Sequence, residues 1–150
     1  MRVIVAMMVL AAPAMAQEDL RIDLTKVHVS DPAACEALEE KGVDAWLDMD
    51  FLSLTFTGGI QSMEFHCNFY DVKGREGGTH LFVDAICELP GEIYPDILAV
   101  TPYSENQIQV VSGADATLAA AGALQATEDM ALPGATIYTR CDNLSEIPVD

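Results

Sequence analysis

Large apolar residues fall on every second position in the middle of this chain. Within residues 49–56 they are Leu52, Leu54 and Phe56, and the residues between them are smaller or more polar. Gly58 and Gly59 follow, and they suit a tight reversal into a second alternating run at residues 60–72. Because side chains two positions apart on a strand share a face, this pattern predicts a β-hairpin.

Two cysteines lie on the apolar faces of consecutive predicted strands. The face of Cys67 in the run 60–72 also holds Met63, Phe65 and Phe69. The face of Cys87 in the next alternating segment, residues 79–89, also holds Leu81, Val83, Ala85 and Leu89. Both faces are therefore expected to point into the protein core.

An antiparallel register that places Cys67 opposite Cys87 agrees with this pattern. It pairs two further sets of inward positions, Phe69 with Ala85 and Phe65 with Leu89. A slip of one residue would destroy these pairs, so the register is well specified here. The match fails nearer the loop at residues 74–80, where Asp71 would face Val83.

Residues 32–41 have the pattern of a short helix instead. Ser30 or Asp31 can accept hydrogen bonds from the first free amides, and Gly42 can end the helix in a left-handed conformation. The apolar side of this helix holds Cys35 together with Ala34 and Leu38. Cys35 is therefore expected to face the core.

Other segments predict further strands and a second helical turn. The strands are expected at residues 20–29, 96–102, 106–112 and 135–141. Asp115 can cap a helical turn that Gly122 closes, whereas the rest of residues 113–134 is left undecided. The predicted fold is one α+β domain: an antiparallel, curled or barrel-like sheet of about six strands with one short N-terminal helix and two disulfides.

Residues 1–16 have the composition of a secretory signal peptide. One arginine precedes an apolar run, and Ala14 and Ala16 provide the small residues that a signal peptidase requires. The run is about half as long as the roughly 20 residues of a membrane span. We therefore expect cleavage before Gln17, which leaves residues 17–150 as a single domain in the periplasm or outside the cell.

The four cysteines then meet an oxidising environment. An even number of cysteines in an exported chain predicts two disulfides. The hairpin register pairs Cys67 with Cys87, which leaves Cys35 and Cys141 to join the helix to the last predicted strand. None of the spacings is C-x-x-C, so a zinc site has little support.

The chain is strongly acidic, with a formal net charge of −17. Removal of residues 1–16 takes away one arginine, and 6 basic against 24 acidic residues then give −18. Such a field repels nucleic acid and anionic lipid, and it attracts cationic proteins and divalent metal ions. We expect no nucleic-acid partner and no membrane insertion after processing, and the partner that the charge favours is a cationic envelope protein. The oligomeric state is not defined by the sequence.

Candidate catalytic and metal-binding residues form no recognisable constellation in the sequence. His28, His66 and His80 stand apart from one another, and the hairpin register gives His66 a neighbour in Glu88. Three aspartates within residues 44–50, namely Asp44, Asp48 and Asp50, have the spacing of calcium ligands. The glycine and terminal glutamate of an EF-hand loop are absent, so they are interpreted as a solvated acidic rim. No catalytic residue, metal site or cofactor is predicted.

The end of the last predicted strand resembles a group of small exported bacterial proteins of uncharacterised function. The resemblance rests on the order of the cysteines and on the closing residues Tyr138-Thr139-Arg140-Cys141. It covers most of residues 17–150. It implies an exported disulfide-linked domain and no particular activity.

A weaker likeness connects the chain to the periplasmic and membrane-bound inhibitors of c-type lysozyme. Those inhibitors are small disulfide-linked β-barrels that present a Ser-Gly-x-x-Tyr loop to the enzyme. Here Ser112-Gly113-Ala114-Asp115 is followed by Ala116 in place of the tyrosine, so the inhibitory residues are not carried over.

The sequence therefore favours a non-catalytic exported binding or inhibitor-like protein of the cell envelope. Two alternatives stay open: a small periplasmic hydrolase with a carboxylate or histidine site, and an acidic structural protein that binds divalent cations weakly. A concave pocket with a histidine and a carboxylate would favour the hydrolase. A flat surface with exposed aromatic side chains would favour a protein partner.

Overall fold

A computed structural model describes residues 20–125 and 132–149 of the chain. The predicted signal peptide and its cleavage site at Ala14, Ala16 and Gln17 lie outside the described residues, as does part of the undecided segment 113–134. Eight antiparallel strands form a closed barrel in which each strand pairs with its neighbour in the sequence and β8 pairs with β1.

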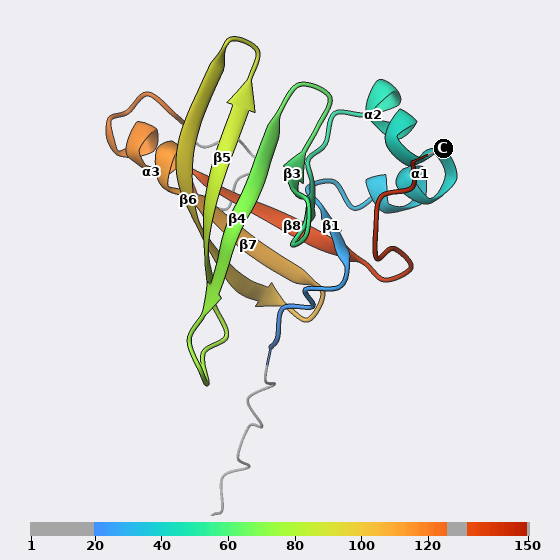
Figure 1. Ribbon diagram of the computed structural model, residues 1–150, viewed down its shortest axis with the longest axis horizontal. Coiled ribbons are helices and arrows are strands. Elements are labelled where there is room, and N and C mark those ends of the chain that lie inside the picture. The colour runs from blue at the N-terminus through green and yellow to red at the C-terminus, as the bar shows by residue number, and fades with distance from the viewer. Residues whose placement is uncertain (1–19, 126–131, 150) are drawn as a thin grey trace, which may run out of the picture.

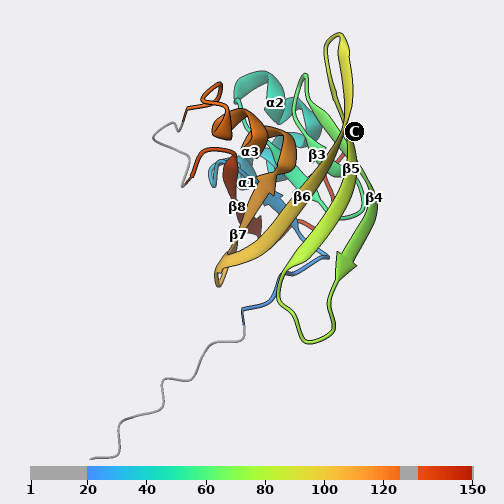
Figure 2. The same cartoon turned by 90° about the vertical axis from the view of Figure 1, so that its left-hand side faces the viewer.

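The strands are β1 (Val27–Val29), β2 (Ser53–Thr55), β3 (Gly59–Gln61), β4 (His66–Gly74), β5 (Leu81–Leu89), β6 (Glu92–Ser104), β7 (Gln107–Ser112) and β8 (Ala135–Cys141). The helices are α1 (Ala34–Lys41), α2 (Ala45–Asp48) and α3 (Gly113–Ala120), and the 3-10 turn η1 (Gly42–Asp44) joins α1 to α2. Helices α1 and α2 lie beside β1, whereas the long strands β4, β5 and β6 form the opposite side of the barrel (Figures 1 and 2).

The predicted number of about six strands is too small, and one reason lies in the run 60–72. A turn at residues 62–65 divides this run into β3 and β4, where the Ser62 amide donates to the Phe65 carbonyl oxygen at 2.8 Å. Met63 is exposed in the turn, so its predicted place on the inward face is wrong. Phe65 precedes β4, and its predicted strand pairing with Leu89 is not formed.

The predicted register between β4 and β5 is confirmed at Cys67. Cys67 pairs with Cys87, Phe69 with Ala85 and His66 with Glu88. Between Phe69 and Asp71 the register shifts by one residue at Tyr70, so that Asp71 faces Asp84 and Val72 faces Val83. This β-bulge removes the mismatch between Asp71 and Val83 that a regular ladder would contain.

The barrel interior forms the larger of two hydrophobic cores. Its buried residues include Leu54, Ile60, Cys67, Val83, Ala85, Cys87, Leu98, Val100, Ile108, Val110 and Tyr138. The disulfide between Cys67 and Cys87 lies in this core and was predicted from the hairpin register. The tight turn before β3 needs Gly59, which has φ +90° and where a Cβ atom would overlap the Cys67 carbonyl oxygen.

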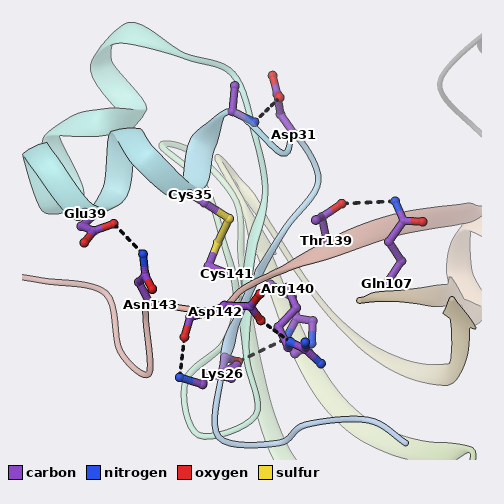
Figure 3. The surroundings of a disulfide bond; sticks show 12 residues. Lys26, Asp31, Cys35, Glu39, Gln107, Thr139, Arg140, Cys141, Asp142 and Asn143 are labelled. Carbon is purple, nitrogen blue, oxygen red and sulfur yellow. Dashed lines mark hydrogen bonds and ion pairs between the residues drawn. A yellow bond between two sulfur atoms is a disulfide. The ribbon is translucent and has the colours of Figure 1, made fainter. Parts of the chain in front are cut away.

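The second core lies between the outer side of β1 and helices α1 and α2. Its buried residues are Val27, Val29, Ala34, Leu38, Ala45, Phe51, Cys141 and Leu144. The predicted disulfide between Cys35 and Cys141 ties α1 to the end of β8 across this core (Figure 3). Helix α1 ends at Gly42 as predicted, with φ +55°. The backbone of Pro148 lies so close to Gly42 that a side chain would not fit.

The first strand is much shorter than the predicted segment 20–29. Only Val27–Val29 pairs with other strands, and Leu24 is exposed. All three residues of β1 are buried because Val27 and Val29 belong to the core under the helices. With both faces of β1 covered, period-2 alternation between apolar and polar residues is not required there.

Helix α3 confirms the predicted helical turn, with a different start. It begins at Gly113, and the Ser112 hydroxyl caps it by accepting a hydrogen bond from the Asp115 amide at 3.1 Å. Asp115 therefore lies in the first turn and is not the cap. The chain reverses at Gly122, which has φ +73°.

Candidate functional site

The structure places the three histidines in different surroundings. His66 and His80 are exposed, and the ring of His80 meets the ring of Phe82 edge to face at 5.7 Å between centroids. Cys67, next to His66, is held in a disulfide, so this His-Cys pair is not a nucleophile and base.

His28 is buried in β1 and has a structural environment. Its Nδ1 lies 3.1 Å from the Lys26 carbonyl oxygen, to which it donates, and its ring meets Phe56 edge to face at 6.1 Å. Burial lowers the pKa of His28, which favours the neutral imidazole.

The closing residues 138–141 each have a contact within the fold. Arg140 Nε donates to Asp142 Oδ1 at 2.7 Å, and its Nη1 donates to the Glu105 carbonyl oxygen at 3.3 Å. Thr139 Oγ1 accepts from Gln107 Nε2 at 3.3 Å, as Figure 3 shows. With Tyr138 in the barrel core and Cys141 in a disulfide, this segment joins the barrel to the helical layer.

The aspartates within residues 44–50 do not gather into a metal site. Asp44, Asp48 and Asp50 are exposed, and Asp48 Oδ2 forms an ion pair with Lys41 Nζ at 2.5 Å. Within residues 20–125 and 132–149, no three histidine, cysteine or acidic side chains are placed to hold a metal ion together.

A cavity of about 260 Å³ opens into the barrel near α3, and we call it the α3-end cavity. Its apolar lining comes from Leu52, Ile60, Phe65, Cys67, Leu89, Leu98 and Val110. Its polar lining comes from Tyr94, Asp96, Ser112, Asp115, Thr136 and Tyr138. Apolar walls with a few polar groups are typical of small-molecule sites in the mouths of β-barrels.

Asp96 is buried in this cavity and is fixed by three donors. Its Oδ1 accepts from the amides of Ile97 and Ala114 at 2.8 and 3.0 Å, and its Oδ2 accepts from the Ser112 hydroxyl at 2.5 Å. Because Ser112 also caps α3, Asp96 holds the first turn of the helix against the end of the barrel.

Asp115 lines the same cavity and has a different environment. Burial, and then the nearby Asp96 carboxylate, raise its pKa above the usual value. The described residues provide no hydrogen-bond donor to its carboxylate, and the Ser112 hydroxyl is bonded to its backbone amide instead. Asp115 is therefore a half-buried carboxylate without a donor of its own.

Two tyrosines complete the polar part of the cavity. Burial raises the pKa of Tyr138, and the charge of Asp115 adds to the shift. Burial is also the main cause of the raised pKa of Tyr94, with smaller effects from Asp115 and Asp96. Both phenols are thus held in their protonated form, which can donate a hydrogen bond.

No pattern in the sequence predicts this cavity. One residue does indicate a polar site, because Asp96 shares the inward face of β6 with Leu98 and Val100. A carboxylate at a buried position needs hydrogen-bond partners. The sequence does not show that Asp115 lies near Asp96, because only barrel closure and the position of α3 bring the two residues together.

A second feature lies on the outside of the barrel, where the outward side chains of β4, β5 and β6 form what we call the open face. Phe82, Ile93 and Ile97 on this face are 51%, 71% and 60% exposed. Across the ladder, Ile97 faces Asp84 and Ile93 faces Glu88. The open face therefore combines exposed apolar side chains with carboxylates.

Comparisons with known protein families, with curated proteins and with solved structures find no match to this chain. None of the helices in the described part of the chain has the length and hydrophobicity to cross a bilayer.

Proposed function

We propose that this chain is an exported, non-catalytic binding protein that docks a cationic protein on its open face. The proposal is carried by one observation: the sheet surface of the long strands β4, β5 and β6 leaves large apolar side chains in solvent. Isolated exposed apolar residues are common, but a group of them on neighbouring strands is typical of an interaction surface. Apolar side chains surrounded by polar ones are also the usual arrangement of a protein interface.

The charges on these strands support a cationic partner. Among the exposed side chains of β4–β6, four carboxylates (Asp71, Asp84, Glu88 and Glu92) stand against one ammonium group, Lys73, which gives a net −3. Lys73 Nζ is bound by Asp71 at 2.9 Å and by Asp84 at 2.7 Å. These contacts raise the pKa of Lys73, and the hydrogen bond that Lys73 donates to Asp84 has the largest effect. The carboxylates would speed the approach of a basic protein.

The disulfides support the exported location. Two disulfides are consistent with an oxidising compartment, where such bonds form and persist. Export itself rests on the composition of residues 1–16. Intact mass of the protein recovered from the periplasm or medium should correspond to a chain that begins at Gln17, and retention of residues 1–16 would contradict this part of the proposal.

The experiment immobilises the processed protein with both disulfides intact and applies defined basic proteins, a c-type lysozyme first. We expect at least one of them to be retained at about 0.15 M salt, because apolar contacts persist where charge is screened. The double variant Ile93→Ser/Ile97→Ser should reduce this retention by about ten-fold or more, as expected for central interface residues.

The matched control is Leu47→Ser. Leu47 is 69% exposed, as exposed as Ile93, but it lies on α2 away from the open face. This variant should retain the partner as the wild type does. The proposal fails if every basic protein elutes at physiological salt, or if the control and the double variant lose the same amount of binding.

One observation supports the alternative function of a small hydrolase: two carboxylates, those of Asp96 and Asp115, line the α3-end cavity. Asp96 is occupied by three donors, and among the described residues no histidine lines this cavity. A hydrolase that used this pair would lose its activity in Asp115→Asn. Screening wild type and Asp115→Asn with ester, amide and glycoside substrates tests this alternative.

A further inference from the structure

The α3-end cavity contains two polar groups that lack partners in the fold. Tyr138 is only 1% exposed and lines the cavity, and its hydroxyl has no hydrogen-bond partner among the described residues. Asp115 lines the same cavity with a carboxylate that accepts no hydrogen bond there. Largely buried polar groups are normally paired with protein, water or ligand, and the Tyr138 hydroxyl is not sealed off from the cavity, so an occupant can pair with it.

The remaining walls define what else the occupant must have. Leu52, Phe65, Leu89 and Val110 belong to the apolar lining, which comes from strands and turns on several sides. A purely polar occupant would leave this surface without an apolar partner. The volume of about 260 Å³ lies at the lower limit of small-molecule sites, so the occupant is small.

The sign of its charge follows from the carboxylates. Asp96 is already satisfied by three donors, whereas Asp115 has an acceptor free and is destabilised by Asp96 beside it. A cation near both would relieve this repulsion, and an N–H donor to an ionised carboxylate makes a strong hydrogen bond. An anion would meet two carboxylates in a partly desolvated space.

We infer that the α3-end cavity binds a small organic amine, with its ammonium group between Asp115 and the Tyr138 hydroxyl and its apolar body against Phe65 and Leu89. The ammonium donates to the Asp115 carboxylate and to the Tyr138 oxygen. Asp96 holds α3 in place and contributes its charge, and Tyr94 offers an aromatic ring to the cation. This site lies inside the barrel, so it does not depend on the open face or on a protein partner.

The probe is phenethylamine, which has one ammonium group and one aromatic ring. Binding to the disulfide-bonded protein is measured by calorimetry and by ¹H–¹⁵N spectra. We expect the amide signals of Ser112, Ala114, Asp115 and Tyr138 to shift with a common dissociation constant below about 1 mM, a modest affinity for a ligand of this size. The neutral analogue 2-phenylethanol should bind about ten-fold more weakly, and the anion 3-phenylpropanoate should not bind.

Two variants locate the ammonium group. Asp115→Asn should weaken phenethylamine binding about ten-fold and leave 2-phenylethanol binding within about two-fold, because only the charge-assisted hydrogen bond is lost. Tyr138→Phe should weaken phenethylamine binding by about three-fold to ten-fold, because the ammonium loses one hydrogen-bond acceptor. Asp44→Asn is the control, since it makes the same charge change at an exposed site on the helical layer.

Several results would overturn the inference. The first is the absence of these amide shifts at 10 mM phenethylamine, a concentration about ten times the highest expected dissociation constant. The second is equal binding of phenethylamine and 3-phenylpropanoate. The third is an equal loss of phenethylamine affinity in Asp44→Asn and Asp115→Asn. If Asp115→Asn fails to fold, the three ligands on the wild type and the Tyr138→Phe variant still decide the question. Loss of protein retention in Ile93→Ser/Ile97→Ser with amine binding intact would separate this site from the proposed docking surface.

Discussion

The two outer sides of the barrel carry the same kind of side chain and differ in what covers them. On β1, the outward residues Val27 and Val29 are fully buried beneath α1 and α2. On β5 and β6, the outward residues Phe82, Ile93 and Ile97 remain in solvent. Outward apolar residues on a barrel strand can thus be covered by another part of the chain, as on β1, or, as we propose for the open face, by another protein.

The covered side is also the side that is cross-linked and hydrogen-bonded to the end of the chain. Cys35 of α1 is bonded to Cys141 of β8, and Asn143 Nδ2 donates to Glu39 Oε2 at 3.5 Å (Figure 3). The Val43 amide donates to the Pro148 carbonyl oxygen at 3.2 Å. The covered side should therefore determine stability, and changes on the open face should affect binding much more than stability.

The largest expected effect on the free energy of unfolding comes from removal of the disulfide on the covered side. Cys35→Ala/Cys141→Ala should lower the free energy of unfolding by about 5 kcal/mol, and Cys67→Ala/Cys87→Ala by about 3 kcal/mol, in the chain-entropy view. The difference arises because the two disulfides close loops with sequence separations of 106 and 20 residues. Urea unfolding of the two double variants measures it, and the opposite order would contradict the prediction.

The next effect compares single side chains on the two sides. Leu38→Ala, in the covered core, should lower the free energy of unfolding by about 2 to 5 kcal/mol because it leaves a cavity in packed surroundings. Ile93→Ala, on the open face, should change it by about 0.5 kcal/mol or less. Thermal and urea unfolding of both variants provide the test, and equal losses would show that the open face is part of the folding core.

A pH effect should arise in β1, between the two cores. Burial places the pKa of His28 below that of an unfolded histidine, so the unfolded chain binds more protons as the pH falls. The stabilisation due to neutral His28 is complete above about pH 6.5 and is lost below it, by up to about 1.4 kcal/mol per pH unit.

The variant His28→Phe isolates this contribution. Its stability at pH 8 should be lower than that of the wild type, because the bond to the Lys26 carbonyl is lost, but its decrease from pH 7 to pH 5 should be smaller. His66→Ala, which removes an exposed histidine, should keep the wild-type pH profile. Urea unfolding at several pH values measures the slopes, and identical slopes for the wild type and His28→Phe would contradict the assignment.

A similarly small effect is expected for a polar pair on the open face. His66 faces Glu88 across the ladder and is exposed, so His66→Ala should lower the free energy of unfolding by only about 0.2 to 1 kcal/mol. Glu88→Gln serves as the partner variant in a double-mutant cycle at low and high salt. A loss well above this range would mean that the open face contributes to stability after all.

Period-2 alternation was enough to predict the β4–β5 register around Cys67 and, with it, both disulfides. It worked because one face of each strand is inside the barrel and the other is in solvent, so a one-residue slip would bury the wrong side chains. It failed at β1, where both faces are covered and Val27, His28 and Val29 are all buried. It also gave no sign that Ser62 and Phe65 form the turn between β3 and β4, because apolar residues continue through this turn in step with the strand.

The site was less predictable than the fold for a different reason. Asp96 and Asp115 lie on β6 and α3, and their encounter depends on how Ser112 caps the helix next to the barrel. No local pattern in the sequence describes such a long-range contact. The open face, by contrast, follows from the alternation, since assigning Val83, Ala85 and Cys87 to the inside assigns Phe82 and Ile86 to the outside.

The pairing of β1 with β8 has a consequence for the order of events during biosynthesis. A chain emerges from the ribosome or a translocation channel N-terminus first, so β1 must wait for nearly the whole chain before its second neighbour appears. Cys35 must wait for Cys141 in the same way, while Cys67 and Cys87 become available earlier. A premature bond from Cys35 to either of them would block barrel closure, and disulfide exchange after the last strand has arrived would be needed to correct it.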